Sequence, residues 1–201
     1  MELHSTRVAI RPWRYRDDVL ANQWPPYDDP LDPLWNLPRQ YDFDRDDWYY
    51  EFDMSASNRV WAVEDRSGRL AGRISIREIN KERSSARLGI TMGSPFVGRG
   101  LGTEALTTFL DYYFFHLDFR VMVLDVAAPN QRAVRCYERL GFRHVTDDWR
   151  RTGSSFNSQV LDQPNYIHLR HYFRLGRQGM GLEVRFFEME LHRDVWSTQR
   201  Y

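Results

Sequence analysis

The stretch Gly98-Arg99-Gly100-Leu101-Gly102-Thr103-Glu104 decides the fold, because it stands between a strand pattern and a helix pattern. Glycines at this spacing let the main chain approach a ligand closely, and the amides at a helix start, reinforced by the helix dipole, suit a pyrophosphate. A glycine-rich turn is also a common connector between elements. The motif alone therefore predicts a strand, a turn and a helix, and leaves the phosphate site open.

The helix after this turn carries one apolar face. Its apolar residues recur at the i, i+3, i+4 and i+7 spacing of a buried stripe: Leu106, Phe109, Leu110, Tyr113, Phe114 and Leu117. This spacing predicts a helix over residues 103–117. A strand at 121–127 and a helix at 130–140, closed by Gly141, come next. The alternation is a βαβα unit, so one pair of strands is expected to be parallel.

Upstream of the turn, strand patterns occupy residues 7–12, 60–64, 70–77 and 86–92. The turn before Leu70 contains Gly68, which supplies the positive φ that a hairpin needs, and a second turn covers residues 80–84. These strands predict an antiparallel meander. Helical pieces are expected at 16–23 and 43–54, in an aromatic and acidic segment that we interpret as a wall over a site.

Downstream, a short strand at 142–145 and a final strand at 184–191 flank a long irregular stretch over 149–182. We interpret residues 150–183 as an insertion, either an acceptor-site flap or a homodimer contact. The predicted fold class is α/β (α+β), with a mixed, mostly antiparallel sheet flanked by helices. At 201 residues the chain is expected to form a single domain over 1–201.

A second motif runs from Asn130 through Ala133 and Tyr137 to Phe142 and reads Asn-Gln-Arg-Ala-Val-Arg-Cys-Tyr-Glu-Arg-Leu-Gly-Phe. Asn130 is a good N-cap, and Ala133 and Tyr137 share its face of the helix. With the glycine turn, in this order and at this separation, the motif resembles the acetyl-CoA-binding core of the GNAT N-acetyltransferase superfamily. Within this superfamily, the residue pattern of the core is most similar to that of ribosomal-protein serine/alanine N-terminal acetyltransferases.

The resemblance implies an acetyl-CoA site. Main-chain amides of the turn would hold the pyrophosphate, and the pantetheine arm would lie between splayed strands at 88–92 and 124–127. The residues implied in binding are Ile90, Met92, Val97, Gly98, Arg99, Gly100, Leu101, Gly102, Thr103, Asn130 and Ala133. Many members carry Gln or Arg where this chain has Val97, so affinity is expected to change modestly, with Arg99 as a substitute cation.

The resemblance also implies that Tyr137 protonates the leaving thiolate, although a tyrosine in such a helix is commonly a half-buried core residue. A general base is harder to assign, because the strand at 88–92 has no carboxylate. Glu78, on the preceding strand, is the first candidate, with an exposed ionic role as its alternative. Asp125 is expected to pair with an arginine.

Composition excludes several other classes. The 28 lysines and arginines balance the 28 aspartates and glutamates, so no global field attracts nucleic acid or an anionic membrane. The single cysteine, Cys136, allows no intramolecular disulfide, and no metal site is expected from the scattered histidines His116, His144, His168, His171 and His192. Without a leader pattern or a long apolar run, the protein is expected to be cytoplasmic.

These observations predict an N-acetyltransferase that transfers an acetyl group from acetyl-CoA to a primary amine, with a protein N-terminus among the acceptors. A polyamine or aminoglycoside acceptor is the alternative, suggested by the acidic residues between 28 and 47. A non-catalytic acyl-CoA-binding protein is the rival from another class. Acceptor specificity is expected to reside in residues 24–54 and 149–182.

Overall fold

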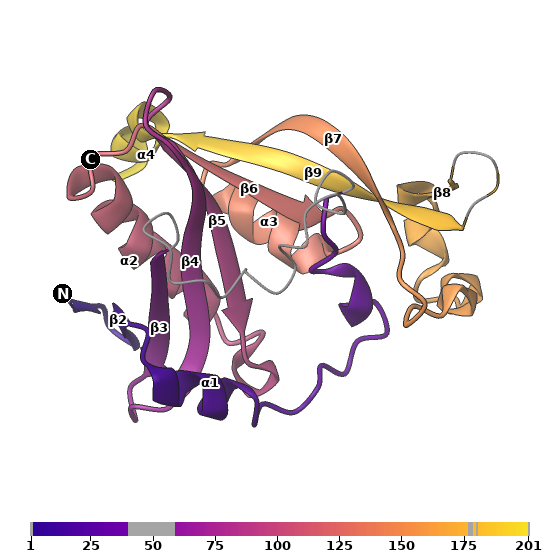
Figure 1. Cartoon of the computed structure of the whole chain (residues 1–201), viewed down its shortest axis with the longest axis horizontal. Helices are drawn as coiled ribbons and strands as arrows, with labels where there is room; N and C mark the ends of the chain where they lie inside the picture. The colour runs from indigo at the N-terminus through magenta and orange to yellow at the C-terminus, as the bar shows by residue number, and fades with distance from the viewer. Residues whose placement is uncertain (1, 40–58, 177–178, 180, 201) are drawn as a thin grey trace. The chain divides into compact units, whose positions relative to one another are not determined.

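The computed structural model describes residues 2–39, 59–176, 179 and 181–200 (Figure 1). They group into two compact units. The first comprises Met1–Tyr27, Met54–Leu124 and Leu191–Tyr201, and the second comprises Asp28–Asp53 and Asp125–Glu190. The helix expected over 43–54 lies outside the described residues, as do the acidic residues from 40 to 58. The expectation of a single domain stays a prediction.

The first unit contains a mostly antiparallel sheet. Each strand from β1 to β5 pairs antiparallel with the next, and β6 pairs parallel with β5. The predicted meander and the predicted parallel pair are therefore confirmed. The strands are β1 (Leu3–His4), β2 (Val8–Pro12), β3 (Arg59–Asp65), β4 (Leu70–Asn80), β5 (Ser85–Met92) and β6 (Val121–Ala127), the last of which ends in the second unit.

Two glycines show why the meander turns and packs as it does. Gly68 has φ 75° in the β3–β4 turn, where the sequence predicts a glycine conformation. Gly72 lies opposite Met92 on β5, and a Cβ at this glycine would meet the Met92 sulfur at 2.6 Å and the Thr91 carbonyl oxygen at 2.8 Å. Any side chain there would push β5 away from β4.

Three helices complete the first unit: α1 (Tyr15–Ala21), α2 (Leu101–Phe115) and α4 (Arg193–Arg200). The predicted stripe is buried from Leu106 to Phe114, with Phe109, Leu110 and Phe114 fully inaccessible, whereas Leu117 lies beyond the end of α2 and is half-buried. On the same face, the buried Tyr113 hydroxyl donates to the Val121 carbonyl oxygen at 2.7 Å. This bond joins the end of α2 to the start of β6.

The second unit is built on β9 (Leu182–His192), which pairs antiparallel with β7 (Arg143–Arg151) and β8 (Phe173–Leu175) (Figure 1). It also holds α3 (Gln131–Arg139) and the 3₁₀ helices η1 (Asp32–Leu34), η5 (Ser158–Asp162) and η6 (Ile167–Tyr172). Its apolar core consists of Leu31, Leu34, Ala127, Phe156, Val160, Leu161, Leu169, Val184 and Phe186.

Two sequence expectations for the second unit are wrong, and the sequence pattern did not indicate one helix of the first unit. The strand expected at 142–145 is the longer β7, which pairs with β9 from Arg143 to Arg151. The stretch expected to be irregular contains the end of β7, two 3₁₀ helices and β8. The helix α4 was not expected. Its Trp196 indole donates to Asp111 at 2.8 Å on α2, so a contact distant in the sequence holds it.

Within the described part of the chain, every helix is too short or too polar to cross a membrane.

Candidate functional site

The glycine turn takes the conformation that its sequence predicts. Gly98 has φ 77° and Gly100 has φ 78°, and Gly100 is the N-cap residue of α2. Both values lie in the left-handed region that favours glycine. The first amides of a helix have no partner within it, so the main chain of 100–102 presents donors together with the positive end of the helix dipole. This geometry suits an anionic ligand.

An ion pair between Arg7 and Glu104 stabilises the turn. The Arg7 guanidinium donates to Glu104 at 2.6 Å and to the Arg99 carbonyl oxygen at 2.9 Å. Ser5 donates to the same carboxylate at 2.7 Å. Burial alone would raise the pKa of Glu104, but the hydrogen bonds from Ser5 and Arg7 outweigh it and lower that pKa. Glu104 therefore remains charged and fixes the start of α2 against β2.

Among the described strands, the edge of β5 that faces away from β4 is paired only over its first three residues. The parallel pairing joins Ser85, Ala86 and Arg87 to residues 121–123, and no further pair of the two described strands continues it. Residues 88–92, which include Ile90 and Met92, keep their pairing with β4 on the other side. An extended ligand can therefore pair with the main chain of this edge as an added strand would.

Aromatic residues cover the end of this edge. Tyr27 donates its hydroxyl to the Met92 carbonyl oxygen, and the Trp24 indole donates to the Leu70 carbonyl oxygen at 3.2 Å. A Cβ at Gly93 would lie 2.7 Å from the Trp24 ring, so Gly93 lets that ring sit flat on the chain. The sequence suggested a wall in this segment but did not identify Trp24 and Tyr27 individually.

The remaining turn residues differ in exposure. Val97 is half-buried and extended at the end of η4 (Ser94–Phe96), and Arg99 is exposed. Leu101 is buried, whereas Gly102 and Thr103 are half-buried in the first turn of α2. A Cβ at Gly102 would lie 3.3 Å from Met92 Cγ, so the glycine brings the helix start close to the end of β5.

In the second unit, Asn130 caps α3. Its side-chain oxygen accepts from the Ala133 amide at 3.2 Å, which confirms the predicted N-cap. The cap uses only that oxygen, so the amide NH₂ group of Asn130 is not consumed by it. Ala133 is half-buried. Gly141 closes the helix with φ 93°, again as the sequence predicts.

Tyr137 lies on α3 with 9% of its surface exposed, and its ring meets Phe142 edge to face at 5.8 Å between centroids. Within the described residues its hydroxyl forms no hydrogen bond, unlike the bonded hydroxyl of Tyr113. Burial raises the pKa of the Tyr137 phenol, and the neighbouring Cys136 adds to the shift. Tyr137 therefore carries its proton at neutral pH, as an acid must before it can donate it.

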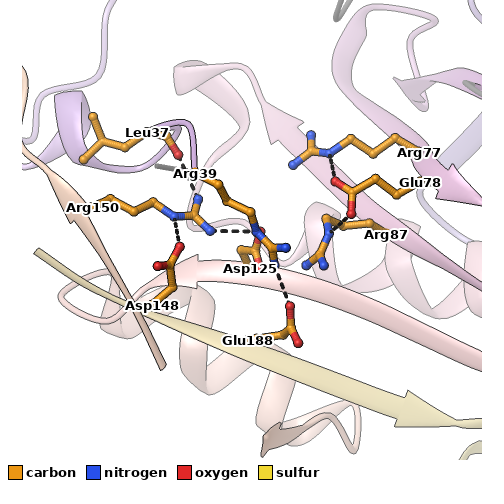
Figure 2. A network of polar contacts seen from close by, with 9 residues as sticks. All are labelled: Leu37, Arg39, Arg77, Glu78, Arg87, Asp125, Asp148, Arg150 and Glu188. Atoms are coloured by element: carbon orange, nitrogen blue, oxygen red, sulfur yellow. Dashed lines mark hydrogen bonds and ion pairs between the residues drawn. The ribbon is translucent and has the colours of Figure 1, made fainter. Parts of the chain in front are cut away.

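Glu78 lies two residues before the end of β4, where the register with β5 shifts, and has φ 49°. Arg87 donates to its carboxylate at 2.8 Å and Arg77 lies 3.7 Å away (Figure 2). It stands four residues beyond Ile74, the partner of Ile90, which is about 13 Å along a strand. These ion pairs favour the ionic role given above as its alternative, and the assignment of Glu78 as general base stays a prediction.

Asp125 pairs with arginines, as expected. Arg39 donates to it at 2.7 Å and Arg150 lies 3.0 Å from it, while only 7% of the Asp125 side chain is exposed. Arg39 also binds Glu188, and Arg150 binds Asp148 at 2.9 Å (Figure 2). Within the second unit, this network links Arg39 to side chains of β6, β7 and β9. Its carboxylates are all engaged by arginines, which suits a structural role.

No group of three metal-ligating side chains occurs among residues 2–39, 59–176, 179 and 181–200.

Curated proteins similar to this chain are spermidine N(1)-acetyltransferases. The protein of Vibrio cholerae serotype O1 is 34% identical over 86 residues, which cover 43% of this chain and 50% of that protein. The protein of Escherichia coli K12 is 32% identical over 96 residues, covering 48% and 51%. The chain thus spans about half of the length of these relatives.

Solved structures share the fold. The spermidine N-acetyltransferase from Vibrio cholerae, in complex with CoA and spermine, superposes with a TM-score of 0.66 at 18% identity, over 96% of this chain and 99% of that one. A chimera of the Vibrio cholerae enzyme and hSSAT gives a TM-score of 0.62 at 19% identity, with the same coverage.

The comparison with known families matches residues 7–143 to the acetyltransferase (GNAT) domain. The match begins at Arg7 and ends just past Gly141, so it includes both the glycine turn and the motif that begins at Asn130. Because it covers more than half of the chain, the protein belongs to the GNAT acetyltransferase domain family.

Proposed function

We propose that the protein is an acetyl-CoA-dependent N-acetyltransferase that acts on a primary amine. The observation that carries the proposal is the open edge of β5 at 88–92, which leads along the chain to the left-handed glycines at the start of α2. An extended pantetheine arm can pair with such an edge, and a pyrophosphate suits such a helix start. The residues present therefore fit the cosubstrate.

Acetyl-CoA supplies an acetyl group activated as a thioester. The chain's own residues would bind and orient it, with main-chain donors of β5 stabilising the charge that develops on the carbonyl oxygen. Tyr137 would hold a proton for the departing sulfur, because its hydroxyl is protonated and not committed to another bond. The acceptor amine must arrive neutral, through Glu78 or through water.

A polyamine is the acceptor that we propose first. The relatives described above act on spermidine by name, whereas our sequence reasoning favoured the ribosomal-protein branch. The acidic residues Asp28, Asp29 and Asp32 are the sequence feature that suggested a cationic acceptor, and burial together with the Asp29 carboxylate raises the pKa of Asp32. Carboxylates in this condition are stabilised by an approaching cation. A protein N-terminus remains the second candidate.

An assay of CoA thiol release tests both the proposed enzyme class and the proposed polyamine acceptor. We expect release with spermidine or spermine to exceed release with peptides that begin with Ser or Ala, and with an aminoglycoside. Higher turnover on the peptides would reject the polyamine and keep the enzyme class. Saturable acetyl-CoA binding without thiol release for any amine would instead support the non-catalytic rival.

As a matched test of the acidic residues, Asp32→Asn should raise the KM for spermidine and leave the acetyl-CoA Kd unchanged. Asp118→Asn is the control, because it removes the same charge from an exposed site on the first unit. Equal KM values for the two variants would remove Asp32 from acceptor binding.

A further inference from the structure

A basic depression lies beside the glycine turn, entirely within the first unit. It encloses about 330 Å³ and is open to solvent. Its lining comes from the start of β2, from the β3–β4 turn and from the turn before α2: Arg7, Asp65, Arg66, Ser67, Arg69, Arg99 and Leu101. Four of these seven side chains are guanidinium groups, although the chain as a whole has no net charge.

Two of the four arginines form ion pairs with carboxylates of this chain, which neutralise their charge. Arg7 is paired with Glu104 at 2.6 Å, and Arg69 is paired with Asp65 at 2.7 Å. Arg66 and Arg99 form no ion pair with any described residue. The depression therefore holds an excess of two positive charges, which a phosphate monoester dianion would match.

The β3–β4 turn holds Arg66 in place. The Asp65 carboxylate accepts from the amides of Ser67 and Arg69 at 2.9 and 3.1 Å, which fixes the turn. Arg66 donates its Nε to the Thr6 carbonyl oxygen at 2.7 Å, so its two terminal nitrogens remain as donors. A guanidinium that is already oriented loses less freedom when it binds an anion.

The depression is continuous with the proposed pyrophosphate site, because Arg99 and Leu101 belong to both. In CoA, the 3′-phosphate is attached to the ribose whose 5′-oxygen carries the pyrophosphate. A pyrophosphate held at the start of α2 therefore brings a phosphate monoester into the neighbourhood of this turn. The adjacent site offers the charge and the donors that such a group requires.

We propose that this depression binds the 3′-phosphate of CoA, with Arg66 and Arg99 as its ligands, so that the protein selects CoA over 3′-dephospho-CoA. The proposal rests on the proposed function, because it needs the pyrophosphate at residues 98–103. The proposal adds Arg66, which lies in the β3–β4 turn. The residues that the family resemblance implies in acetyl-CoA binding all lie outside this turn. Inorganic phosphate shares the same chemistry and is the other source of a ligand here.

Isothermal titration calorimetry with CoA and with 3′-dephospho-CoA tests the proposal. We expect the wild-type protein to bind CoA about tenfold more tightly, as one charge-assisted contact would give. Arg66→Gln should bring the two affinities within about twofold by weakening CoA binding alone. Arg120→Gln, which removes the same charge from an exposed position in the first unit, should retain the full preference.

Three results would overturn the assignment. Equal affinities in the wild-type protein, or a preference that Arg66→Gln leaves intact, would each reject the 3′-phosphate contact while CoA binding itself persists. Inorganic phosphate that binds through Arg66 without competing against CoA would assign the depression to a separate anion. A wild-type protein that binds neither nucleotide would instead reject the proposed function, so the two failures are distinguishable.

Discussion

The candidate binding groups of the two units, each taken by itself, differ in kind. The first presents main-chain atoms, along the open edge of β5 and at the start of α2, where the side chains serve mainly to brace the backbone. The second presents side chains, Asn130 and Tyr137, on one short helix. A substitution in the first unit should therefore act through backbone conformation, whereas one in the second should act through the chemical group that it removes.

Tyr137→Phe should have the largest effect, because it removes the proton source and keeps the ring that packs on Phe142. General acid catalysis contributes roughly 10²- to 10⁴-fold, so kcat should fall by that factor while the acetyl-CoA Kd and the Tm stay unchanged. Tyr113→Phe is the matched control. It breaks a buried hydrogen bond and should lower stability by about 1 kcal/mol without changing kcat per folded molecule.

A kcat within twofold of wild type for Tyr137→Phe, at saturating acetyl-CoA and across pH, would remove Tyr137 from the mechanism. The proposed chemical role of a side chain in the second unit would then be lost, and with it the contrast with the main-chain groups of the first unit.

Two buried carboxylates test whether the units unfold together. Asp17→Asn removes the partner of Arg11 in the first unit, where the two groups meet at 2.6 and 2.9 Å. Asp125→Asn removes the partner of Arg150 in the second. Each variant removes one of the two carboxylates that engage a buried guanidinium, since Arg11 also pairs with Glu64 and Arg150 with Asp148, and this should cost up to about 3 kcal/mol of unfolding free energy. In a single domain, both should lower one shared calorimetric transition.

Separate transitions, each lowered by only one of the two variants, would contradict the single-domain prediction. The matched pair makes this result interpretable, because both changes remove a carboxylate and preserve its shape.

Gly100→Asp should weaken acetyl-CoA binding by up to about 100-fold, because a like charge beside a pyrophosphate costs several kcal/mol; a Cβ at this position would lie 3.1 Å from Arg7, whose guanidinium offsets part of that charge. The control is Gly100→Asn, which adds a neutral side chain of the same shape to the same left-handed position. Calorimetry should show a much smaller loss for Asn. Unchanged affinity in a folded Asp variant would show that the turn is only a connector.

The smallest effect concerns acid stability. Hydrogen bonds from Ser67 and Arg69 outweigh the burial of Asp65 and lower its pKa to about 2. A depressed carboxylate pKa stabilises the fold above the unfolded value near 4, and this contribution is lost as pH falls from about 4 to 2. Asp65→Asn should therefore reduce the change in unfolding free energy over that range by about 1–2 kcal/mol. An unchanged pH slope in urea denaturation would contradict this account.

Local signals made the first unit readable from sequence. The apolar stripe of α2 and the glycines at 68 and 98–102 each determine a conformation without help from distant residues. The Asn130 cap and Gly141 were identified in the second unit for the same reason. The positions of Tyr137 and Asn130 in the site came from the family resemblance rather than from their own chemistry.

What the sequence concealed depends on distant contacts. Most of β7 is exposed, so it lacks the apolar alternation of a half-buried strand, and only pairing with β9 defines it. The helix α4 is held by Asp111, 85 residues away from Trp196. The depression near Arg66 combines three separate segments, none of which carries a motif.

The open edge of β5 also has a consequence for colloidal behaviour. An exposed strand edge is a template on which another chain can pair, and natural proteins usually cover or charge such edges. If the pantetheine arm pairs with this edge as proposed, a charge or a bulge that blocked the edge would also obstruct the arm, so the ligand itself would serve as its cover. The empty protein should therefore be the species that aggregates during storage or overexpression, and a cell that keeps CoA abundant would keep this chain monodisperse.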